Sequence, residues 1–433
     1  MSRVVVVGGG FGGTASAVRL AKLGHDVTIV ERLDRLGDAV GRVERDGFGW
    51  DAGPTSTALP AVIRDLFRKS GRPLERELDL VPVEPMREHR FGDGTVLPLP
   101  SGSRSAQLEA VERALGAGLG RQWVDYVHAQ ARSWDLLRRA YLERPYSPDQ
   151  LDKETSALLH TRRTLHKAVA RTLKDQRLRD LALFTAVLDG HDPRKVPSWM
   201  GMWAYVEQNF GLWTVPGGMG ALAEAMATRV TERNVQVLLG TTAQDLRLHG
   251  GRVAGVDTDH GTVEADVVVC AVDPWQLPVL RQYVDRALPT APPAVCHLGL
   301  AGEVPDLPPE VVLHGDSTLV VRTNGTAPEG CAAWTLLGRG VRSQDIVVAL
   351  ARQGIDVREQ VVVRVDRSPR DQVEELSGSP YGVPWQGRAT TRRKLAGPPL
   401  DGVFAAGVHA AAGAGLPFVG LAAAVVAQQI GPA

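Results

Sequence analysis

The chain has 433 residues, more than one simple hydrophobic core usually spans, so we expect two domains. Apolar residues make up 44% and charged residues 23% of the chain, which is typical of a globular protein and argues against a disordered or fibrous one. Lys plus Arg and Asp plus Glu both number 49, so no net charge favours nucleic acid as a partner.

The cysteine content and the hydropathy limit the location of the chain. Cys270, Cys296 and Cys331 have neither metal-ligand spacing nor a disulfide pattern, so we expect no metal site and a reduced, cytoplasmic compartment. The valine run at 4–7 is too short for a signal peptide. Residues 402–433 contain no Asp, Glu, Lys or Arg, but glycines and a proline break them into pieces too short to cross a bilayer. We therefore expect no transmembrane segment, although contact with a membrane surface stays open.

The first thirty residues predict a strand, a glycine turn and a helix. The β-branched run at 4–7 is typical of a buried parallel strand. Gly8, Gly10 and Gly13 then fill the G-x-G-x-x-G spacing, in which the glycines permit a tight turn, approach to a pyrophosphate and close helix packing. The helix predicted over 14–23 would direct its free N–H groups at the phosphates.

An acidic residue completes this unit. Val27–Val30 predict a second strand, and Glu31 follows it about 20 residues after the turn, where a carboxylate accepts hydrogen bonds from ribose hydroxyls. Strands, helix and acid together indicate a dinucleotide-binding unit, with an ordinary βαβ unit that binds nothing as the alternative. The pattern does not separate NAD from FAD.

The next segment is polar and then rich in glycine. Gly41 and Arg42 follow the acid, and the guanidinium would reach the phosphates of a cofactor or, alternatively, lie in solvent. The loop at 48–55 is dense in glycine, proline and aromatic residues, which is typical of backbone held close to a flat ligand or a tight turn.

The middle of the chain is mostly helical. We expect a short helix over 61–68, a hairpin around the turn at 92–94, and helices from 108 onward, with two more between 155 and 188. Aromatic residues recur at helical spacing over 123–137. They predict either a core or the wall of an apolar substrate tunnel.

Aromatic and glycine-rich segments follow. Trp203 and Tyr205 lie in the aromatic segment and are candidates for a substrate pocket. The glycine-rich stretch 211–220 precedes a helix expected over 221–230, which again favours the approach of a ligand to backbone. Residues 235–269 predict a β-meander followed by a strand.

Four of these stretches together resemble FAD-dependent oxidoreductases related to the bacterial phytoene desaturases, within the amine-oxidase-like flavoprotein superfamily. The stretches carrying the resemblance are the N-terminal unit through Thr55, then Trp213–Leu222, the meander ending at Ala271–Pro274, and Gly402–Pro417 with the closing helix. They cover roughly the cofactor half of the chain.

The resemblance implies an α/β fold in which a Rossmann-like FAD-binding domain of the glutathione-reductase/amine-oxidase type is interleaved with an α+β substrate domain. The FAD-binding domain would comprise residues 1–75, 205–280 and 395–433. The substrate domain, with a helical region, would comprise residues 76–204 and 281–394.

The resemblance also implies extended FAD and its contacts. The expected contacts involve the pyrophosphate, the ribose, the phosphates, the flavin ring, the adenine and the ribityl chain. In chain order, the residues expected to make them are Gly8, Gly10, Phe11, Gly12, Gly13, Glu31, Arg32, Gly41, Arg42, Gly53, Pro54, Thr55, Ala243, Gly407, Leu416, Pro417 and Phe418. Because no cysteine follows Cys331, the C-terminal segment offers no thiol for a covalent bond, and we expect non-covalent FAD.

The chemistry expected of such a site needs few side chains, because hydride transfer to flavin N5 depends mainly on position and the exclusion of water. No catalytic residue is evident from the sequence. His409, shortly after Gly407, is one candidate base, with an ordinary loop histidine as the alternative. Trp203, Tyr205 and Phe418 are candidates for the pocket above the ring.

Three classes of function remain. The first is a desaturase or dehydrogenase that removes hydride from a largely apolar substrate, an isoprenoid or secondary metabolite, with oxygen or a quinone as electron acceptor. The second is an amine or amide oxidase acting on a C–N bond. The third is a non-catalytic lipid-binding relative, disfavoured because the glycine turn with Glu31 indicates a bound nucleotide.

Overall fold

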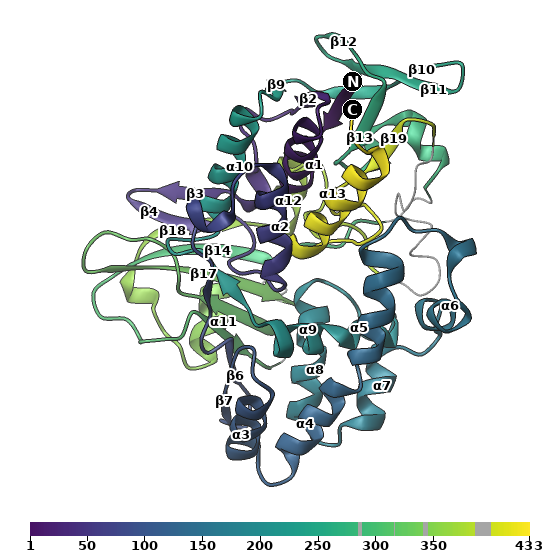
Figure 1. Cartoon of the computed structure of the whole chain (residues 1–433). Coiled ribbons are helices and arrows are strands. Elements are labelled where there is room, and N and C mark those ends of the chain that lie inside the picture. Colours follow the sequence, from purple (N-terminus) through teal and green to yellow (C-terminus); the bar gives the residue numbers. More distant parts are fainter. Residues whose placement is uncertain (285–287, 316, 341–344, 386–399) are drawn as a thin grey trace.

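A parallel sheet that includes strands from both ends of the chain forms the core of one half of the molecule, at the top of Figure 1. The computed structural model describes residues 1–284, 288–315, 317–340, 345–385 and 400–433. The sheet has the strand order β19-β13-β1-β2-β9. Its strands are β1 (Arg3–Val7), β2 (Asp26–Val30), β9 (Gln236–Leu238), β13 (Val267–Cys270) and β19 (Val403–Ala405). The valines at 4–7 are buried because both faces of the sheet are covered.

Helices cover one face of this sheet (Figure 1). They are α1 (Phe11–Lys22), α2 (Pro60–Ser70), α10 (Gly220–Glu232) and α13 (Leu416–Ile430). Val4 and Val6 pack into one apolar cluster with Ile63, Met226 and Val426 from three of these helices. The first and last helices of the chain therefore share one core.

An antiparallel meander covers the opposite face, through a cluster that joins Val5 and Val7 to Leu246 and Val256. Its strands are β10 (Ala243–His249), β11 (Arg252–Thr258) and β12 (Gly261–Glu264). The prediction of a meander beginning at 235 is wrong in its first strand, because residues 236–238 form β9 of the parallel sheet. The preceding helix α10 makes a crossover, which returns the chain parallel to β2.

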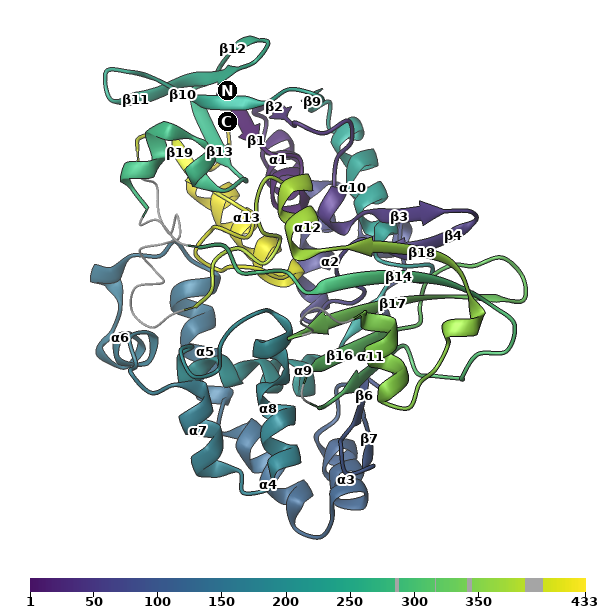
Figure 2. The ribbon, with the colours of Figure 1, turned by 180° about the vertical axis from the view of Figure 1, so that it is seen from behind.

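A mixed seven-stranded sheet forms the second half of the molecule, with the order β18-β14-β17-β16-β15-β6-β7. Its strands are β6 (Arg87–Arg90), β7 (Val96–Leu99), β14 (Ala294–Ala301), β15 (Glu310–Leu313), β16 (Thr318–Arg322), β17 (Cys331–Arg339) and β18 (Val361–Arg367). Figure 2 shows α11 (Ile346–Arg352) over one face of it. The predicted hairpin at 92–94 is confirmed as the turn between β6 and β7.

Seven helices pack beside this sheet, and α8 lies against the face opposite α11. They are α3 (Arg104–Leu115), α4 (Leu119–His128), α5 (Ala131–Leu137), α6 (Lys153–Leu159), α7 (Leu165–Thr172), α8 (Gln176–Leu188) and α9 (Met202–Phe210). The prediction of two helices between 155 and 188 is wrong, because Thr164 and Asp175 each cap a new helix with a side-chain hydrogen bond.

Smaller elements link the halves. They are the hairpin of β3 (Arg42–Arg45) and β4 (Phe48–Asp51), the pair of β5 (Val81–Pro82) and β8 (Trp213–Thr214), and α12 (Pro369–Glu375). The predicted domain bounds stay a prediction, and the bound at 394–395 lies outside the described residues. No helix in the described ranges combines the length and apolar character needed to cross a bilayer.

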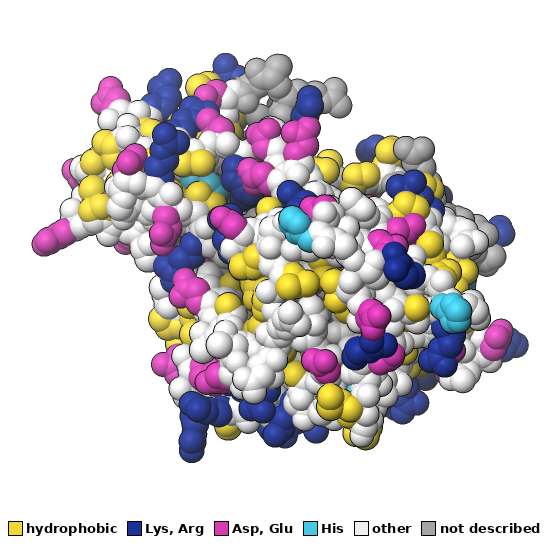
Figure 3. Space-filling view, turned by 90° about the horizontal axis from the view of Figure 1, so that it is seen from above, with side chains coloured by type: hydrophobic (Ala, Val, Ile, Leu, Met, Phe, Trp, Pro, Cys, Tyr) yellow, Lys and Arg dark blue, Asp and Glu magenta, His cyan; other side chains and the backbone are white. Residues whose placement is uncertain are grey.

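Charged side chains of both signs are interspersed over the face seen from above, with apolar side chains between them (Figure 3). This mixture agrees with the equal numbers of acidic and basic residues in the chain. On this face no single charge sign predominates.

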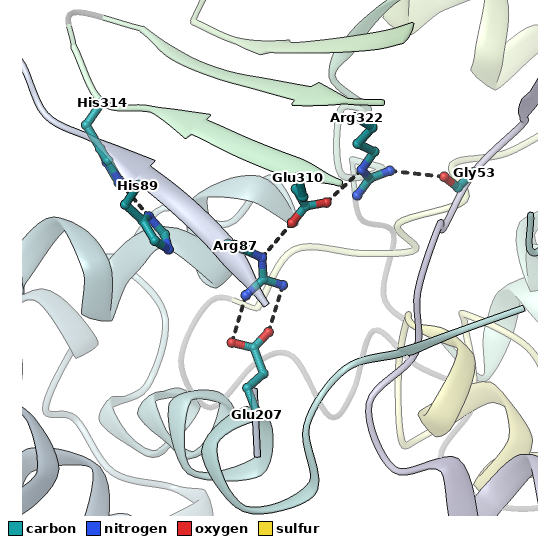
Figure 4. Close-up of polar contacts among 7 residues, drawn as sticks. All are labelled: Gly53, Arg87, His89, Glu207, Glu310, His314 and Arg322. Carbon is teal, nitrogen blue, oxygen red and sulfur yellow. Dashed lines mark hydrogen bonds and ion pairs between the residues drawn. The ribbon is translucent and has the colours of Figure 1, made fainter. Parts of the chain in front are cut away.

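A buried chain of alternating charges joins the helical region to the second sheet (Figure 4). Arg87 on β6 donates to both carboxylate oxygens of Glu207 on α9, at 2.9 and 3.0 Å, and to Glu310 on β15 at 2.6 Å. Arg322 on β16 donates to the other oxygen of Glu310 at 2.8 Å and to the Gly53 carbonyl at 3.2 Å. A side chain of the seven-stranded sheet therefore holds the loop at Gly53 in place.

Each charged side chain in this buried set is stabilised by its oppositely charged neighbours. Burial acts to raise the pKa of Glu310, but Arg322 and Arg87 outweigh it and hold that pKa below its usual range. Burial likewise opposes the charge on Arg87, while Glu207 and Glu310 raise its pKa. Removing one partner would therefore leave buried charges uncompensated.

We expect Arg87→Met to destabilise the protein by about 3–5 kcal/mol, because Glu207 and Glu310 would lose a buried cation. Urea unfolding followed by tryptophan fluorescence measures the change. Arg90→Met is the control on the same strand, because its partly exposed pair with Glu88 should contribute at most about 1 kcal/mol. Equal stability of the Arg87 variant and the wild type would contradict the role given to this chain of charges.

Candidate active site

A cavity of ≈ 430 Å³ runs from the carboxyl ends of the parallel strands to the second sheet. Its first part is lined by the glycine turn, Glu31, the loop at 51–58 and the C-terminal segment from Gly407. Its second part is lined by residues of α8, α9, β14 and β17. Ligand sites in open α/β sheets occur at these strand ends.

The glycine turn has the geometry that a pyrophosphate needs. Gly8 has φ +100°, a conformation that favours glycine. A Cβ on Gly13 would lie 1.9 Å from the Gly8 carbonyl oxygen, so the third glycine lets α1 pack on β1. A Cβ on Gly10 would meet nothing within 4 Å, and Gly8, Gly10, Phe11 and Gly12 all line the cavity. The free N–H groups of the first turn of α1 lie at this wall.

Glu31 and Arg32 lie at the end of β2 and line the cavity. The Glu31 carboxylate accepts hydrogen bonds from the backbone N–H groups of Gly9 at 2.5 Å and Leu33 at 2.7 Å. These two bonds fix its orientation and leave lone pairs for a ligand. Arg32 donates to the carbonyl of Glu375.

The structure places Gly41 and Arg42 outside the described lining of the cavity. The Arg42 guanidinium lies 3.4 Å from the carboxylate of Glu224, and its stem packs where a Cβ on Gly220 would be, 2.3 Å away. The phosphate contact expected of Arg42 thus stays a prediction. Gly13, which packs α1 on β1, also lies behind the lining.

The loop Gly53–Pro54–Thr55 lines the middle of the cavity. A Cβ on Gly53 would lie 2.3 Å from the Ala39 carbonyl oxygen, so only glycine fits here. Just before it, Asp51 accepts a 2.9 Å hydrogen bond from the Gly220 N–H, and burial raises the pKa of this carboxyl. The glycine-rich stretch at 211–220 therefore supports the loop, and its Leu212 also lines the cavity.

The C-terminal segment closes the cavity from the other side. Gly407, Leu416, Pro417 and Phe418 line it, and a Cβ on Gly12 would lie 2.6 Å from the Gly407 nitrogen, so the two ends of the chain are in contact. The first turn of α13 faces the cavity, as the first turn of α1 does.

Two further predicted residues lie at the cavity. Ala243, the first residue of β10, is part of its lining. His409 also lines it and is 5% exposed, and its role as a base stays a prediction.

These features fit FAD. Two helix N-termini offer backbone donors that suit phosphate and the electron-rich edge of a flavin, and the oriented Glu31 carboxylate at the end of β2 suits the hydroxyls of a ribose. The glycines leave room for backbone to approach the cofactor closely.

The far part of the cavity contains the substrate candidates. Trp203 lines it and meets the Phe418 ring edge to face, with centroids 4.3 Å apart. Tyr205, on the same helix, is absent from the described lining, so its place in the substrate pocket stays a prediction. Sequence reasoning missed the polar residues of this part, which are Arg87, Asp189, His297, Arg322, Thr335 and Tyr381.

His297 presents an imidazole to this cavity from the centre of β14. Its Nδ1 lies 2.9 Å from the Thr335 hydroxyl, and among the described residues its buried Nε2 has no hydrogen-bond partner. Burial lowers the pKa of His297 to about 4, so the ring is neutral at physiological pH. A single histidine within a β-strand has no sequence pattern that would mark it as a residue of the site.

Comparison with known proteins identifies the family. Residues 11–415 match the family of flavin containing amine oxidoreductases. A hydroxyneurosporene desaturase of Cereibacter sphaeroides is 29% identical, with 99% of this chain and 97% of that protein covered. A zeta-carotene-forming phytoene desaturase of Myxococcus xanthus is 32% identical, with 63% of this chain covered but only 53% of that protein.

Solved structures agree on the fold. A putrescine oxidase bound to putrescine has a TM-score of 0.69 at 16% identity, with 99% of this chain and 98% of that chain covered. A putative protoporphyrinogen oxidase from Exiguobacterium has a TM-score of 0.64 at 18% identity, with 99% and 98% covered. These structures confirm the predicted α/β fold class. The family match and the curated relatives confirm the family resemblance and FAD as cofactor. The chain belongs to the flavin containing amine oxidoreductase family and is an FAD-dependent oxidoreductase.

Proposed function

We propose that this enzyme is a desaturase or dehydrogenase that removes hydride from a largely apolar substrate, an isoprenoid or a secondary metabolite. The observation that carries the proposal is a single cavity that connects the cofactor-binding elements to an apolar wall. The wall consists of Leu188, Trp203, Leu212, Val295 and Leu337. A relative that matches over nearly its whole length is named for the desaturation of a hydroxylated polyene, which supports the same class.

We assign the first part of the cavity to non-covalent FAD in an extended pose. The α1 turn would bind the pyrophosphate, Glu31 the ribose and Ala243 the adenine. Gly53–Thr55 would lie beside the flavin ring, with Gly407 and Leu416–Phe418 over the ring and the ribityl chain. Bound FAD supplies a hydride acceptor at flavin N5.

The chain's own residues would orient the substrate and exclude water. Trp203 and Phe418 form an apolar edge-to-face pair at the junction of the two parts of the cavity, where they would hold a hydrocarbon against the ring. The first turn of α13 would direct N–H groups at the flavin edge on which negative charge develops. We propose oxygen or a quinone as the electron acceptor and a cytoplasmic location.

Two other functions are less well supported. An amine oxidase would act by the same hydride transfer, but the amine oxidases among the solved structures share only the fold, at 15–17% identity. A non-catalytic lipid-binding role would not need the oriented Glu31 carboxylate at the glycine turn.

We expect Glu31→Gln to weaken FAD binding roughly 10- to 100-fold, because hydrogen bonds to a charged acceptor contribute about 1.5–3 kcal/mol. Titration of the apoprotein with FAD, followed by quenching of flavin fluorescence, measures the affinity. Asp34→Asn is the control, because Asp34 belongs to the same loop but its side chain is 90% exposed. The ribose assignment fails if both variants bind FAD as the wild type does.

The reaction class is tested by anaerobic reduction of the holoenzyme. We expect hydroxyneurosporene or phytoene to remove the visible flavin absorbance, because hydride transfer reduces the ring, and putrescine and cyclohexylamine to leave it unchanged. The reverse result, with amines reducing the flavin and the polyenes not, would establish the amine oxidase alternative instead.

A further inference from the structure

Asp189 is a carboxylate in an unfavourable position. It follows the last residue of α8 as its C-cap, where the negative end of the helix dipole disfavours a negative charge. Its side chain lines the far part of the cavity and forms no hydrogen bond with any described residue. Burial raises the pKa of Asp189 to about 7. A carboxyl group that lines a cavity and has such a raised pKa is a candidate for a functional role.

The nearest cation does not neutralise this carboxylate by direct contact. Arg339 donates to the Leu188 carbonyl at 2.8 and 3.0 Å and to the carbonyl of Ala291, and its guanidinium lies 5.2 Å from the Tyr381 ring centroid. These contacts cap α8 and direct the donors of Arg339 at carbonyl oxygens. The Asp189 carboxylate is left facing the cavity.

Aromatic side chains adjoin the carboxylate. A smaller cavity of ≈ 40 Å³ shares Asp189, Trp203 and Tyr381 with the main cavity. Its wall also contains Trp199 and Trp385, whose rings meet edge to face at 4.9 Å. Asp189 thus stands at the junction of the main cavity and an aromatic recess. His297 on β14, whose Nε2 has no hydrogen-bond partner among the described residues, also lines the main cavity, so more than one element places polar atoms there.

The charges around Asp189 favour a neutral hydrogen-bond donor over a cation. Arg87, Glu207, Glu310 and Arg322 balance one another in their own network. Arg339 lies at longer range, and its positive charge acts to lower the pKa of Asp189. A substrate ammonium would place a second cation against one carboxylate, whereas a hydroxyl would satisfy the acceptor without changing the charge.

We propose that Asp189 is a substrate-contacting, specificity-determining residue whose carboxylate accepts a hydrogen bond from a hydroxyl group on an otherwise apolar substrate, with the adjacent hydrocarbon against the aromatic recess. This inference rests on the proposed function, since it names the substrate class of the same cavity. The enzyme accordingly selects hydroxylated over plain hydrocarbon substrates.

Binding of matched ligands to the holoenzyme tests the proposal through perturbation of the visible flavin spectrum. The probes are farnesol and farnesene, which share an isoprenoid chain and differ in the hydroxyl. The wild type should bind farnesol roughly 10- to 100-fold more tightly. Asp189→Leu should lose this preference while its farnesene affinity stays unchanged, and Asp189→Asn should keep part of it. Asp192→Asn, an exposed carboxylate three residues on, should behave as the wild type.

The pH dependence separates contact with the ligand from a structural role. Among the described residues, the ionisable groups around Asp189 are Arg339, Glu207, Arg87, Arg322 and Tyr381, with His191 in the wall of the smaller cavity, and Glu207 and Arg87 are locked in an ion pair. The preference for farnesol should therefore fall as the pH drops through about 7 in the wild type, because the carboxylate becomes protonated. Asp189→Asn should show no such step. A step retained in that variant overturns the proposal.

Three other results would also overturn it: equal wild-type affinity for farnesol and farnesene, a preference retained in Asp189→Leu, or tighter binding of farnesylamine than of farnesol. Failure of the proposed function is separate. If the holoenzyme prefers farnesol through Asp189 but no polyene reduces the flavin anaerobically, the contact stands and desaturation is rejected. Since Asp189→Asn removes a partly buried charge that has no direct partner among the described residues, it should fold at least as stably as the wild type.

Discussion

The buried chain of alternating charges, from Glu207 through Arg87 and Glu310 to Arg322, is the constraint on which the arrangement of the site depends. Each ion is removed from water and is stable only with its neighbours in place. These four paired side chains therefore require α9, β6, β15 and β16 to occupy their positions together. The chain of charges ends on the Gly53 carbonyl, so it also fixes the loop that we assign to the flavin ring.

The same loop is held at other points from the second sheet. Arg367 at the end of β18 donates to the Ala52 carbonyl at 3.2 Å, and Trp50 on β4 donates its indole N–H to the Leu298 carbonyl on β14 at 3.2 Å. These bonds connect residues more than 200 positions apart. As a result, the backbone assigned to the cofactor and the wall assigned to the substrate are parts of one rigid arrangement. Such rigidity suits hydride transfer, which depends on the relative position of donor and acceptor.

The parts of the site that the sequence predicts are those with local causes. The turn from Gly8 to Gly13, the strand before it and Glu31 after it lie within one short segment, and their spacing carries the geometry. The polar residues of the far cavity have no such signal, because Arg87 lies 120 and 223 positions from Glu207 and Glu310 in the sequence. The spacing of residues along the sequence also does not predict where a given side chain points.

Arg42 and Tyr205 illustrate that limit. Each belongs to a segment that contributes to the site, yet Arg42 pairs with Glu224 and Tyr205 lies outside the described cavity lining. A periodic pattern fixes an element and its buried face, but the neighbours packed against that face decide where a given side chain lies. Predictions for the backbone-lined cofactor site are therefore more secure than those for the side-chain-lined substrate site.

The balance of charge in the far cavity explains why a single carboxylate there has consequences. The network of two arginines and two glutamates is neutral within itself and leaves no cation to pair directly with Asp189. A cavity that needed only apolar contact would be more stable with a neutral residue at the end of α8, where both burial and the helix dipole oppose a negative charge. The stability lost at that position is regained only when something in the cavity donates to the carboxylate. The far cavity combines leucine, valine and tryptophan with polar side chains such as His297 and Thr335. Because the Asp189 carboxylate has no direct partner among the described residues, the substrate that we propose carries a hydrogen-bond donor that matches it.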